Sequence, residues 1–266
     1  MNYQKLSQDI VQWIREYAVN NKLESLHIAV SGGIDSAVVS TLCAMTSLPT
    51  FCYSLPIESH PDNNANANIQ LDWLHLKFPN TFTTEFDLTH IYKGFSPHCL
   101  NDLSRANTKS RIRMVFLYSQ ANNDNGLVVG TGNACEDMGI FYFTKFGDGG
   151  VDISPIGGLM KSEVYGLAKY LQIPEEIQKA IPNDGLYKGN PEDHSDEKRI
   201  GASYDELEWA MKYIAEDLTH ALSKRQEEVL NIYNNLHSKG KHKAEMPPIF
   251  KIDRRKYKTY ADYHIA

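Results

Sequence analysis

The sequence predicts an α/β domain with a parallel sheet and helices on both of its faces. Segments typical of buried strands alternate with segments whose apolar residues recur at helical spacing, which indicates successive strand–helix–strand units. Because such units are almost always right-handed, their helices cover both faces of the sheet. The 266 residues, 42% of them hydrophobic, are enough for one such domain, and no repeat or linker divides them. We therefore expect a single domain over residues 1–266.

Five segments read as strands because they are rich in apolar, β-branched or aromatic residues and are bounded by turn residues. In chain order they are 26–30, 50–55, 81–88, 126–131 and 151–156. The predicted helices between and after them are 36–46, 66–78, roughly 105–121 and a segment around 164–171.

Residues at helical spacing mark the inner faces of four helices. At the N-terminus they are Leu6, Ile10, Trp13, Ile14 and Tyr17, and within 105–121 they are Ile112, Val115, Phe116 and Ser119. Two helices near the C-terminus are marked by Leu207, Met211, Ile214 and Leu218, and by Leu222, Val229, Leu230, Tyr233 and Leu236.

The segment 183–203 is polar, rich in Gly, Asn and Asp, and long for a loop inside one domain. Loops of this length are usually functional or disordered. We expect a flexible lid that becomes ordered when a nucleotide binds and excludes water from the reaction.

Composition excludes several classes of protein. The net charge of -6 disfavours a nucleic-acid partner, and no apolar run reaches the roughly 18 residues of a membrane helix. The first residues carry Gln, Asp, Arg and Glu, unlike a signal peptide. Four cysteines without CxxC spacing indicate reduced thiols. We expect a cytoplasmic protein that binds neither nucleic acid nor membrane.

The most informative short stretch is SGGIDS, residues 31–36, between a predicted strand and a predicted helix. The first turn of a helix leaves backbone N–H groups unpaired, and glycines let a phosphate approach them. Ser31 and Ser36 add hydroxyl donors. Asp35 has the wrong charge for a phosphate site unless a Mg²⁺ ion lies between its carboxylate and the phosphates.

Three other interpretations of this turn compete. A Walker loop requires GxxxxGK[ST], but no lysine follows these glycines, and the dinucleotide fingerprint GxGxxG is absent. A structural turn with no ligand remains the simplest alternative. Residue types alone do not exclude it.

SGGIDS resembles the pyrophosphate-binding loop of the ATP pyrophosphatase (PP-loop) superfamily, whose members cleave ATP between the α and β phosphates. Residues 128–164, VVGTGNACEDMGIFYFTKFGDGGVDISPIGGLMKSEV, closely resemble the central block of one member family, the ammonia-dependent NAD synthetases. Further similarity lies in ANTKSRIRMVFLY, in SDE…GASYDEL and in KHK near the C-terminus. The resemblance covers most of the chain and implies a Rossmann-like fold of the adenine nucleotide alpha hydrolase type.

The resemblance implies an ATP site that contains Mg²⁺. Asp35 and Glu136 are expected to bind the ion, and Asp35 and Lys161 to act in catalysis. Asn183 stands where the family usually has Thr or Ser, and Gly132 replaces a frequent Asp. The expected ATP-binding residues are Ala29, Val30, Ser31, Gly32, Gly33, Ile34, Asp35, Ser36, Thr131, Lys161 and Asn183.

The resemblance also implies a site for the second substrate, deamido-NAD. Its expected residues are Arg111, Lys145, Asp152, His242 and Lys243. Members of the family are homodimers that bind this substrate near the subunit interface. From pattern alone, Arg111 would be read as a surface arginine.

The implied reaction is ATP-dependent amidation of deamido-NAD to NAD through an adenylated intermediate, releasing AMP and pyrophosphate. We expect ammonia as the nitrogen donor, because the first 25 residues leave no room for a glutamine amidase domain. Two alternatives remain open: the same chemistry on nicotinate mononucleotide, and an ATP-binding module without catalysis. Residues Asp35, Glu136, Lys145 and Lys161 argue against the second.

Overall fold

The structure, a computed structural model, describes residues 1–183, 185–186, 195–218 and 221–257. Its centre is a sheet of four parallel strands in the order β3-β2-β1-β4. The strands are β1 (Ser25–Ala29), β2 (Thr50–Ser54), β3 (Thr81–Glu85) and β4 (Gly126–Val128). In the register, Ile28 of β1 lies opposite Cys52 of β2, and Leu26 of β1 lies opposite Leu127 of β4. The predicted fold class is confirmed.

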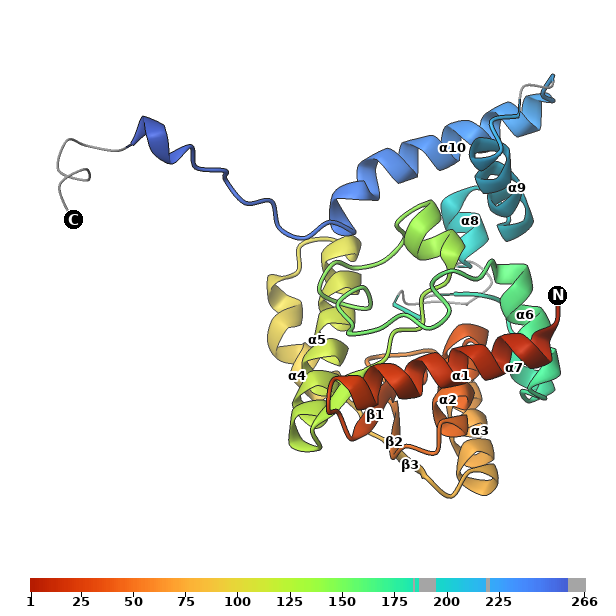
Figure 1. Cartoon of the computed structure of the whole chain (residues 1–266), viewed down its shortest axis with the longest axis vertical. Coiled ribbons are helices and arrows are strands. Elements are labelled where there is room, and N and C mark those ends of the chain that lie inside the picture. Colours follow the sequence, from red (N-terminus) through yellow and green to blue (C-terminus); the bar gives the residue numbers. More distant parts are fainter. Residues whose placement is uncertain (184, 187–194, 219–220, 258–266) are drawn as a thin grey trace.

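Helices cover both faces of this sheet (Figure 1). One face packs against α1 (Tyr3–Asn20), α2 (Ile34–Met45), α3 (Pro61–Lys77) and α6 (Lys161–Tyr170), and the other against α4 (Thr89–Phe95) and α5 (Asp102–Asn123). The remaining elements are η1 (Ser96–His98), η2 (Cys135–Gly139), α7 (Glu175–Lys179), α8 (Asp196–Ile200), α9 (Tyr204–Ala215), α10 (Lys224–Gly240), η3 (Lys241–Lys243) and η4 (Arg254–Lys256).

The buried residues form three hydrophobic clusters. Leu26 and Ile28 alternate along β1 and belong to the cluster beneath α1, α2 and α6. Tyr53 and Val128 belong to the cluster on the opposite face, beneath α5. The third cluster lies outside the sheet and joins η2 to α8, α9 and α10. This third cluster anchors the C-terminal helices beside the carboxyl edge of the sheet.

The prediction of a fifth strand at 151–156 is wrong. The segment runs beside the end of β4 but forms only a single parallel bridge, between Val129 and Ile153. The carboxylate of Asp152 accepts the Val128 N–H at 2.7 Å, so a side chain replaces one ladder bond. Pro155 has no N–H to donate, which ends the pairing. β3 and β4 are also shorter than predicted, ending at Glu85 and Val128.

Several predicted helix faces are only partly buried. On α5, Ile112 is buried as predicted, but Val115 is 72% exposed and Ser119 is also exposed. The other buried residues of this helix include Ser110, Met114, Leu117 and Ala121. On α1, Ile14 is buried while Trp13 and Tyr17 remain exposed. On the C-terminal helices, Ile214 and Leu218 are exposed, Leu218 lies beyond the end of α9, and Leu222 precedes α10.

The predicted loop 183–203 is too long at its C-terminal end. Residues 195–203 form helix α8 and the turn that leads into α9, closed by left-handed Gly201. Ser203 caps α9 in a capping box with Glu206. Residue 184 and residues 187–194, which include much of the predicted lid, lie outside the described residues.

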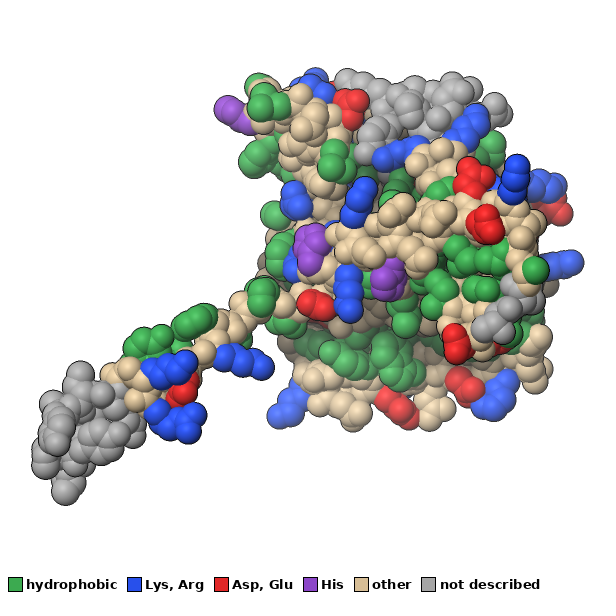
Figure 2. Space-filling model, turned by 90° about the horizontal axis from the view of Figure 1, so that it is seen from above, with side chains coloured by type: hydrophobic (Ala, Val, Ile, Leu, Met, Phe, Trp, Pro, Cys, Tyr) green, Lys and Arg blue, Asp and Glu red, His purple; other side chains and the backbone are tan. Residues whose placement is uncertain are grey.

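A short arm, residues 244–257, projects from the body of the molecule (Figures 1 and 2). It carries exposed Met246, Ile249 and Phe250 and the basic residues of η4. Within the described ranges, the helices are all too short or too polar to cross a membrane.

The buried His27 on β1 gives the fold a specific pH dependence. Its ring lies 3.0 Å from Ser25 Oγ and 3.2 Å from Tyr53 Oη, stacked on Phe51. Burial lowers the pKa of His27 to about 4, although the carboxylate of Asp124 acts in the opposite direction. The unfolded chain therefore binds a proton near pH 6.5 that the folded chain does not.

We expect the free energy of unfolding to fall as pH decreases from 6.5 towards 4, by up to about 3 kcal/mol from this residue. Urea denaturation at several pH values measures the change. His27→Gln should flatten this part of the pH profile, whereas the matched variant His75→Gln, at an exposed position on α3, should not. An unchanged profile in His27→Gln would contradict the assignment.

Candidate active site

A pocket of about 260 Å³ opens at the carboxyl edge of the sheet. After β1, the chain adds β2 and then β3 on one side of it, and only later adds β4 on the other side. The order in which strands are added to the sheet therefore reverses between β1 and β4. Open α/β sheets bind ligands at this kind of switch point. The pocket is lined by the turn after β1, by residues after β4 and by Lys161 at the start of α6.

The glycine turn after β1 requires its glycines. Gly32 has φ +86, and a side chain at this position would collide with the backbone oxygen of Asn63 on α3. Gly33 is the N-cap of α2 and supplies no side-chain cap. The Ser36 hydroxyl donates to Gly33 O and accepts from Ser31 N, which fixes the loop. The first turn of α2 therefore presents its N–H groups to the pocket.

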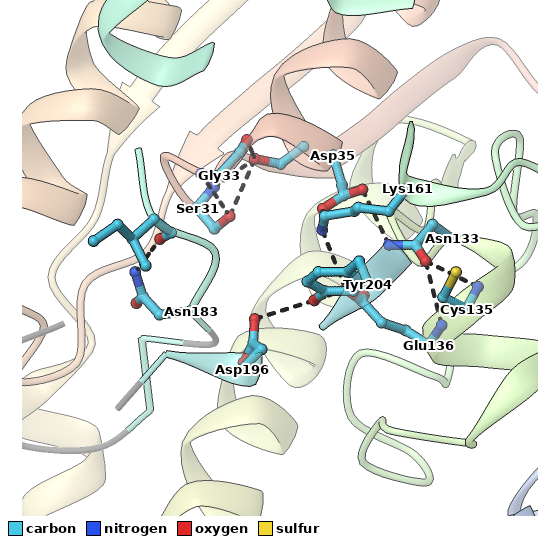
Figure 3. A network of polar contacts seen from close by, with 12 residues as sticks. Ser31, Gly33, Asp35, Asn133, Cys135, Glu136, Lys161, Asn183, Asp196 and Tyr204 are labelled. Atoms are coloured by element: carbon cyan, nitrogen blue, oxygen red, sulfur yellow. Dashed lines mark hydrogen bonds and ion pairs between the residues drawn. The ribbon is translucent and has the colours of Figure 1, made fainter. Parts of the chain in front are cut away.

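Lys161 lies between the two carboxylates that were predicted to bind a metal. Its Nζ is 2.5 Å from Asp35 Oδ2 and 3.2 Å from Glu136 Oε1 (Figure 3). The three side chains come from α6, α2 and η2, and each is at least four-fifths buried. Sequence reasoning placed them at one site, and the structure brings them into direct contact.

The charges of this cluster affect one another. Burial lowers the pKa of Lys161, but Asp35 and Glu136 outweigh it and raise that pKa well above its ordinary value. Burial raises the pKa of Asp35 despite the nearby ammonium. Burial also acts to raise the pKa of Glu136, but Lys161 and hydrogen bonds lower it overall. The ammonium thus acts as a permanent cation between two buried acids.

Sequence reasoning missed two residues that organise the cluster. The Asn133 amide donates to Asp35 Oδ1 at 3.2 Å, while its oxygen accepts the N–H groups of Cys135 and Glu136. The Tyr204 hydroxyl donates to Glu136 Oε1 at 2.6 Å. Burial and the nearby carboxylates raise the pKa of Tyr204 far above its ordinary value, so this hydroxyl keeps its proton. Asn133 lies three residues before Glu136, within the stretch that resembles the family, but its contact with Asp35 joins residues 98 apart. Tyr204 lies 68 residues beyond Glu136, so no local sequence signal pointed to that contact.

The donor set fits Mg²⁺ if phosphate oxygens complete the coordination. In the described part of the chain, no group of three or more His, Cys, Asp and Glu side chains is placed to hold a metal alone. Asp35 and Glu136 nevertheless share one cation already, the Lys161 ammonium, and they offer the hard oxygen ligands that Mg²⁺ prefers. Mg²⁺ commonly binds proteins through one or two carboxylates together with substrate phosphates.

Two further acids line the pocket. The carboxylate of Asp137 lies in the space that a side chain at position 132 would occupy. Residue 132 is a glycine, and the neighbouring Asp137 places an acid at this point of the pocket. Burial and the carboxylates of Glu136, Asp148 and Asp35 raise the pKa of Asp137 to about 7. Asp148 is held by Ser110 Oγ at 2.6 Å and by Thr144 N at 3.1 Å. Sequence reasoning named neither acid as a site residue.

The predicted ATP residues all line this pocket. They are Ala29, Val30, Ser31, Gly32, Gly33, Ile34, Asp35, Ser36, Thr131, Lys161 and Asn183, together with Glu136. Asn183 accepts a hydrogen bond from Asn63 Nδ2 at 2.8 Å, which ties the segment after α7 to α3.

The residues predicted to bind deamido-NAD lie outside the pocket lining. Arg111 Nε donates to Lys145 O, and Lys145 Nζ donates to the backbone oxygen of His242 at 2.9 Å. Lys243 Nζ donates to the backbone oxygen of Phe143, so these four residues form one group around η3. Asp152 is separate and accepts from Tyr118 Oη and Val128 N.

The fold and the pocket define a nucleotide-binding α/β protein of the PP-loop class. The sequence pattern of the family described as NAD synthase matches residues 6–247. An NH(3)-dependent NAD(+) synthetase from Carboxydothermus hydrogenoformans is 34% identical over 94% of this chain and 98% of its own length, and one from Alkaliphilus oremlandii is 36% identical with the same coverage. The chain belongs to the NAD synthase family.

Solved structures resemble the whole fold. One described as NMN synthetase from Francisella tularensis matches with a TM-score of 0.83 and 30% identity, covering 95% of this chain and 100% of the other. An NH3-dependent NAD synthetase from Campylobacter jejuni, in complex with nitrate, matches with a TM-score of 0.76 and 28% identity, covering 94% and 100%.

Proposed function

We propose that this protein is an ammonia-dependent ligase that converts deamido-NAD into NAD, with ATP as co-substrate. The observation that carries the proposal is the cluster of Asp35, Glu136 and Lys161 beside the glycine turn. A departing pyrophosphate requires fixed N–H donors and cations at one place, and this site can supply both. The relatives named NH(3)-dependent NAD(+) synthetase, which match almost the whole chain, indicate the substrate.

The reaction has two steps. The nicotinate carboxylate attacks the α-phosphorus of ATP, the bond to the β-phosphate oxygen breaks, and pyrophosphate leaves. Ammonia then attacks the activated carbonyl carbon, the bond to the AMP oxygen breaks, and loss of a proton gives the amide. Adenylation is needed because a carboxylate oxygen by itself is a poor leaving group, and the protein contributes positioning and charge stabilisation.

We assign the residues of the pocket to ATP. The N–H groups of residues 32–36 and the hydroxyls of Ser31 and Ser36 bind the phosphates, and Thr131 and Asn183 contact the nucleotide from the pocket wall. Asp35 and Glu136 would hold Mg²⁺, which when bound neutralises phosphate charge and the leaving group. Lys161 exchanges its carboxylate partners for phosphate oxygens, where its charge stabilises the transferring group.

We further propose that the second substrate binds across a homodimer. Arg111, Lys145, His242 and Lys243 form their group outside the pocket of their own chain, while Asp152 lies on the segment beside β4. Val115 and Leu103 leave the same helix, α5, with an exposed apolar surface. Sedimentation as a monomer at micromolar concentration would count against this arrangement.

We place the enzyme in the cytoplasm. All four cysteines, Cys43, Cys52, Cys99 and Cys135, are free and buried, which fits a reducing compartment. Recovery of the native protein from a secreted or membrane fraction would contradict this location.

A second candidate substrate is nicotinate mononucleotide. The structure described as NMN synthetase has a TM-score of 0.83 and is covered over its full length by this chain. The activation chemistry would be unchanged, because the carboxylate and the ATP pocket are the same for both substrates. Only the contacts to the second nucleotide differ.

Mass spectrometry of the products decides among these functions. With ATP, Mg²⁺ and ammonium, we expect deamido-NAD to give NAD, AMP and pyrophosphate, with kcat/KM at least about tenfold higher than for the mononucleotide, a difference of about 1.4 kcal/mol. Glutamine as the sole nitrogen source should give no product. A preference for the mononucleotide would support the second candidate, and absence of pyrophosphate with either acid would indicate a non-catalytic ATP-binding module.

A further inference from the structure

Tyr204 contacts charged residues of the nucleotide site but does not itself line the pocket. Its hydroxyl donates to Glu136 Oε1 at 2.6 Å and lies 3.4 Å from Asp196 Oδ2 (Figure 3). The Lys161 ammonium lies over its ring, 4.6 Å from the ring centroid. The pocket lining includes Glu136, Lys161 and Asp196 but not Tyr204, so this tyrosine stands behind them.

The fold holds Tyr204 in a fixed position. It is the first residue of α9 and only 6% exposed, within the third hydrophobic cluster. Its N–H donates to Glu197 Oε1 at 2.9 Å, and the preceding residue, Ser203, forms the capping box of the helix. A side chain with its backbone anchored in this way can determine the orientation of the groups that it contacts.

The shared atom is Glu136 Oε1. The hydrogen bond from Tyr204 and the ion pair with Lys161, at 3.2 Å, both end on this oxygen. If the ammonium leaves the carboxylates for a phosphate, the hydroxyl still donates to Oε1 and keeps the carboxylate from rotating. The ring meanwhile offers the moving ammonium a face on which it is attracted by the cation–π interaction.

We propose that Tyr204 is a positioning residue that orients Glu136 for a divalent cation and supports Lys161 as it moves between carboxylates and phosphate. This inference rests on the proposed function and deepens it. The hydroxyl orients the Glu136 carboxylate that binds the divalent cation, and the ring supports the Lys161 ammonium. The two parts of one side chain therefore have separable effects.

The test uses Tyr204→Phe and Tyr204→Leu in the full chain. Mn²⁺ binding is measured by electron paramagnetic resonance with α,β-methylene-ATP, and the Mg²⁺ dependence of turnover is measured in parallel. Tyr204→Phe should weaken Mn²⁺ binding about tenfold, as removal of a group that orients a metal ligand does. It should raise the Mg²⁺ concentration for half-maximal rate similarly, with kcat largely restored at high Mg²⁺.

Tyr204→Leu, which also removes the ring, should lower kcat a further threefold or more even at saturating Mg²⁺, the loss expected for a cation–π contact. Tyr233→Phe is the matched control, because Tyr233 is a buried tyrosine of the same cluster on α10, and it should bind Mn²⁺ like the wild type. Thermal melting of each variant separates loss of fold from loss of binding.

Wild-type Mn²⁺ affinity in a folded Tyr204→Phe protein would overturn the inference, as would an equal loss in Tyr233→Phe. The binding measurement needs only the ATP analogue, so it tests Tyr204 even if the nicotinate substrate has been assigned wrongly. The product analysis tests that assignment separately.

Discussion

Asp35→Asn lowers kcat/KM for amide formation by a factor of about 10³ or more, corresponding to about 4 kcal/mol of lost transition-state stabilisation. The asparagine keeps the shape of the side chain and can still contact Asn133, but it removes a negative ligand for the cation that neutralises pyrophosphate. Lys161 keeps Glu136 as a carboxylate partner at 3.2 Å in this variant, which limits the loss of stability from the broken pair with Asp35.

The measurement is kcat/KM for pyrophosphate release, taken from rates over a range of deamido-NAD concentrations at saturating ATP and ammonium, together with thermal melting. Asp72→Asn on α3, an exposed position, is the control and should retain wild-type activity. Pyrophosphate release within tenfold of the wild type in Asp35→Asn would remove the metal role from this residue.

Lys161→Met lowers kcat by about 10³, because it removes the cation expected at the transferring phosphoryl group. In the protein without nucleotide, it also leaves Asp35 and Glu136 without the ammonium that separates them. The unpaired acids destabilise the fold by up to about 3–5 kcal/mol, and a divalent cation should recover part of this loss.

This variant gives opposite signs in two assays, which distinguishes it from simple damage to the site. Turnover decreases, whereas Mn²⁺ binding in the absence of nucleotide becomes tighter because no ammonium competes for the carboxylates. Lys169→Met changes an exposed lysine on the same helix and should alter neither quantity. Weaker Mn²⁺ binding in Lys161→Met would contradict the view that the ammonium occupies the position of the cation.

The sheet could be predicted because its signals are local. Residues 26–30 and the helix after them, α2, are mostly apolar on both sides of the turn at 31–33, and few other structures suit such a segment. The segment 151–156 has the same composition as a strand, but its pairing depends on Asp152 accepting the Val128 N–H. That contact joins residues 24 apart and cannot be seen in a periodicity.

The inner face of α5 was predicted only in part, because Ile112 and Phe116 pack into the core while Val115 and Ser119 do not. Its buried stripe contains Lys109, 2% exposed, and Ser110, 6% exposed. Polar residues at buried positions shift the apparent hydrophobic face towards Val115 and Ser119. Lys109 is buried because it meets Glu58 at 3.7 Å, the backbone oxygen of Leu186 and the ring of Tyr92.

The residues of the candidate site that belong to a recognisable motif were predicted from the sequence. The glycine turn has a physical reading of its own, and the family resemblance added Glu136 and Lys161. Tyr204, Asn133 and Asp137 were missed because their roles arise from contacts made after folding. Tyr204 lies 68 residues beyond Glu136 in the chain.

The central claim is that the turn after β1, together with Asp35, Glu136 and Lys161, binds the pyrophosphate that leaves ATP. A crystal structure with α,β-methylene-ATP and Mn²⁺ tests it most directly. We predict phosphate oxygens against the N–H groups of residues 32–36, Mn²⁺ on Asp35 and Glu136, and Lys161 withdrawn from the carboxylates to a phosphate. A triphosphate bound elsewhere, with Lys161 still paired to both acids, would contradict the account.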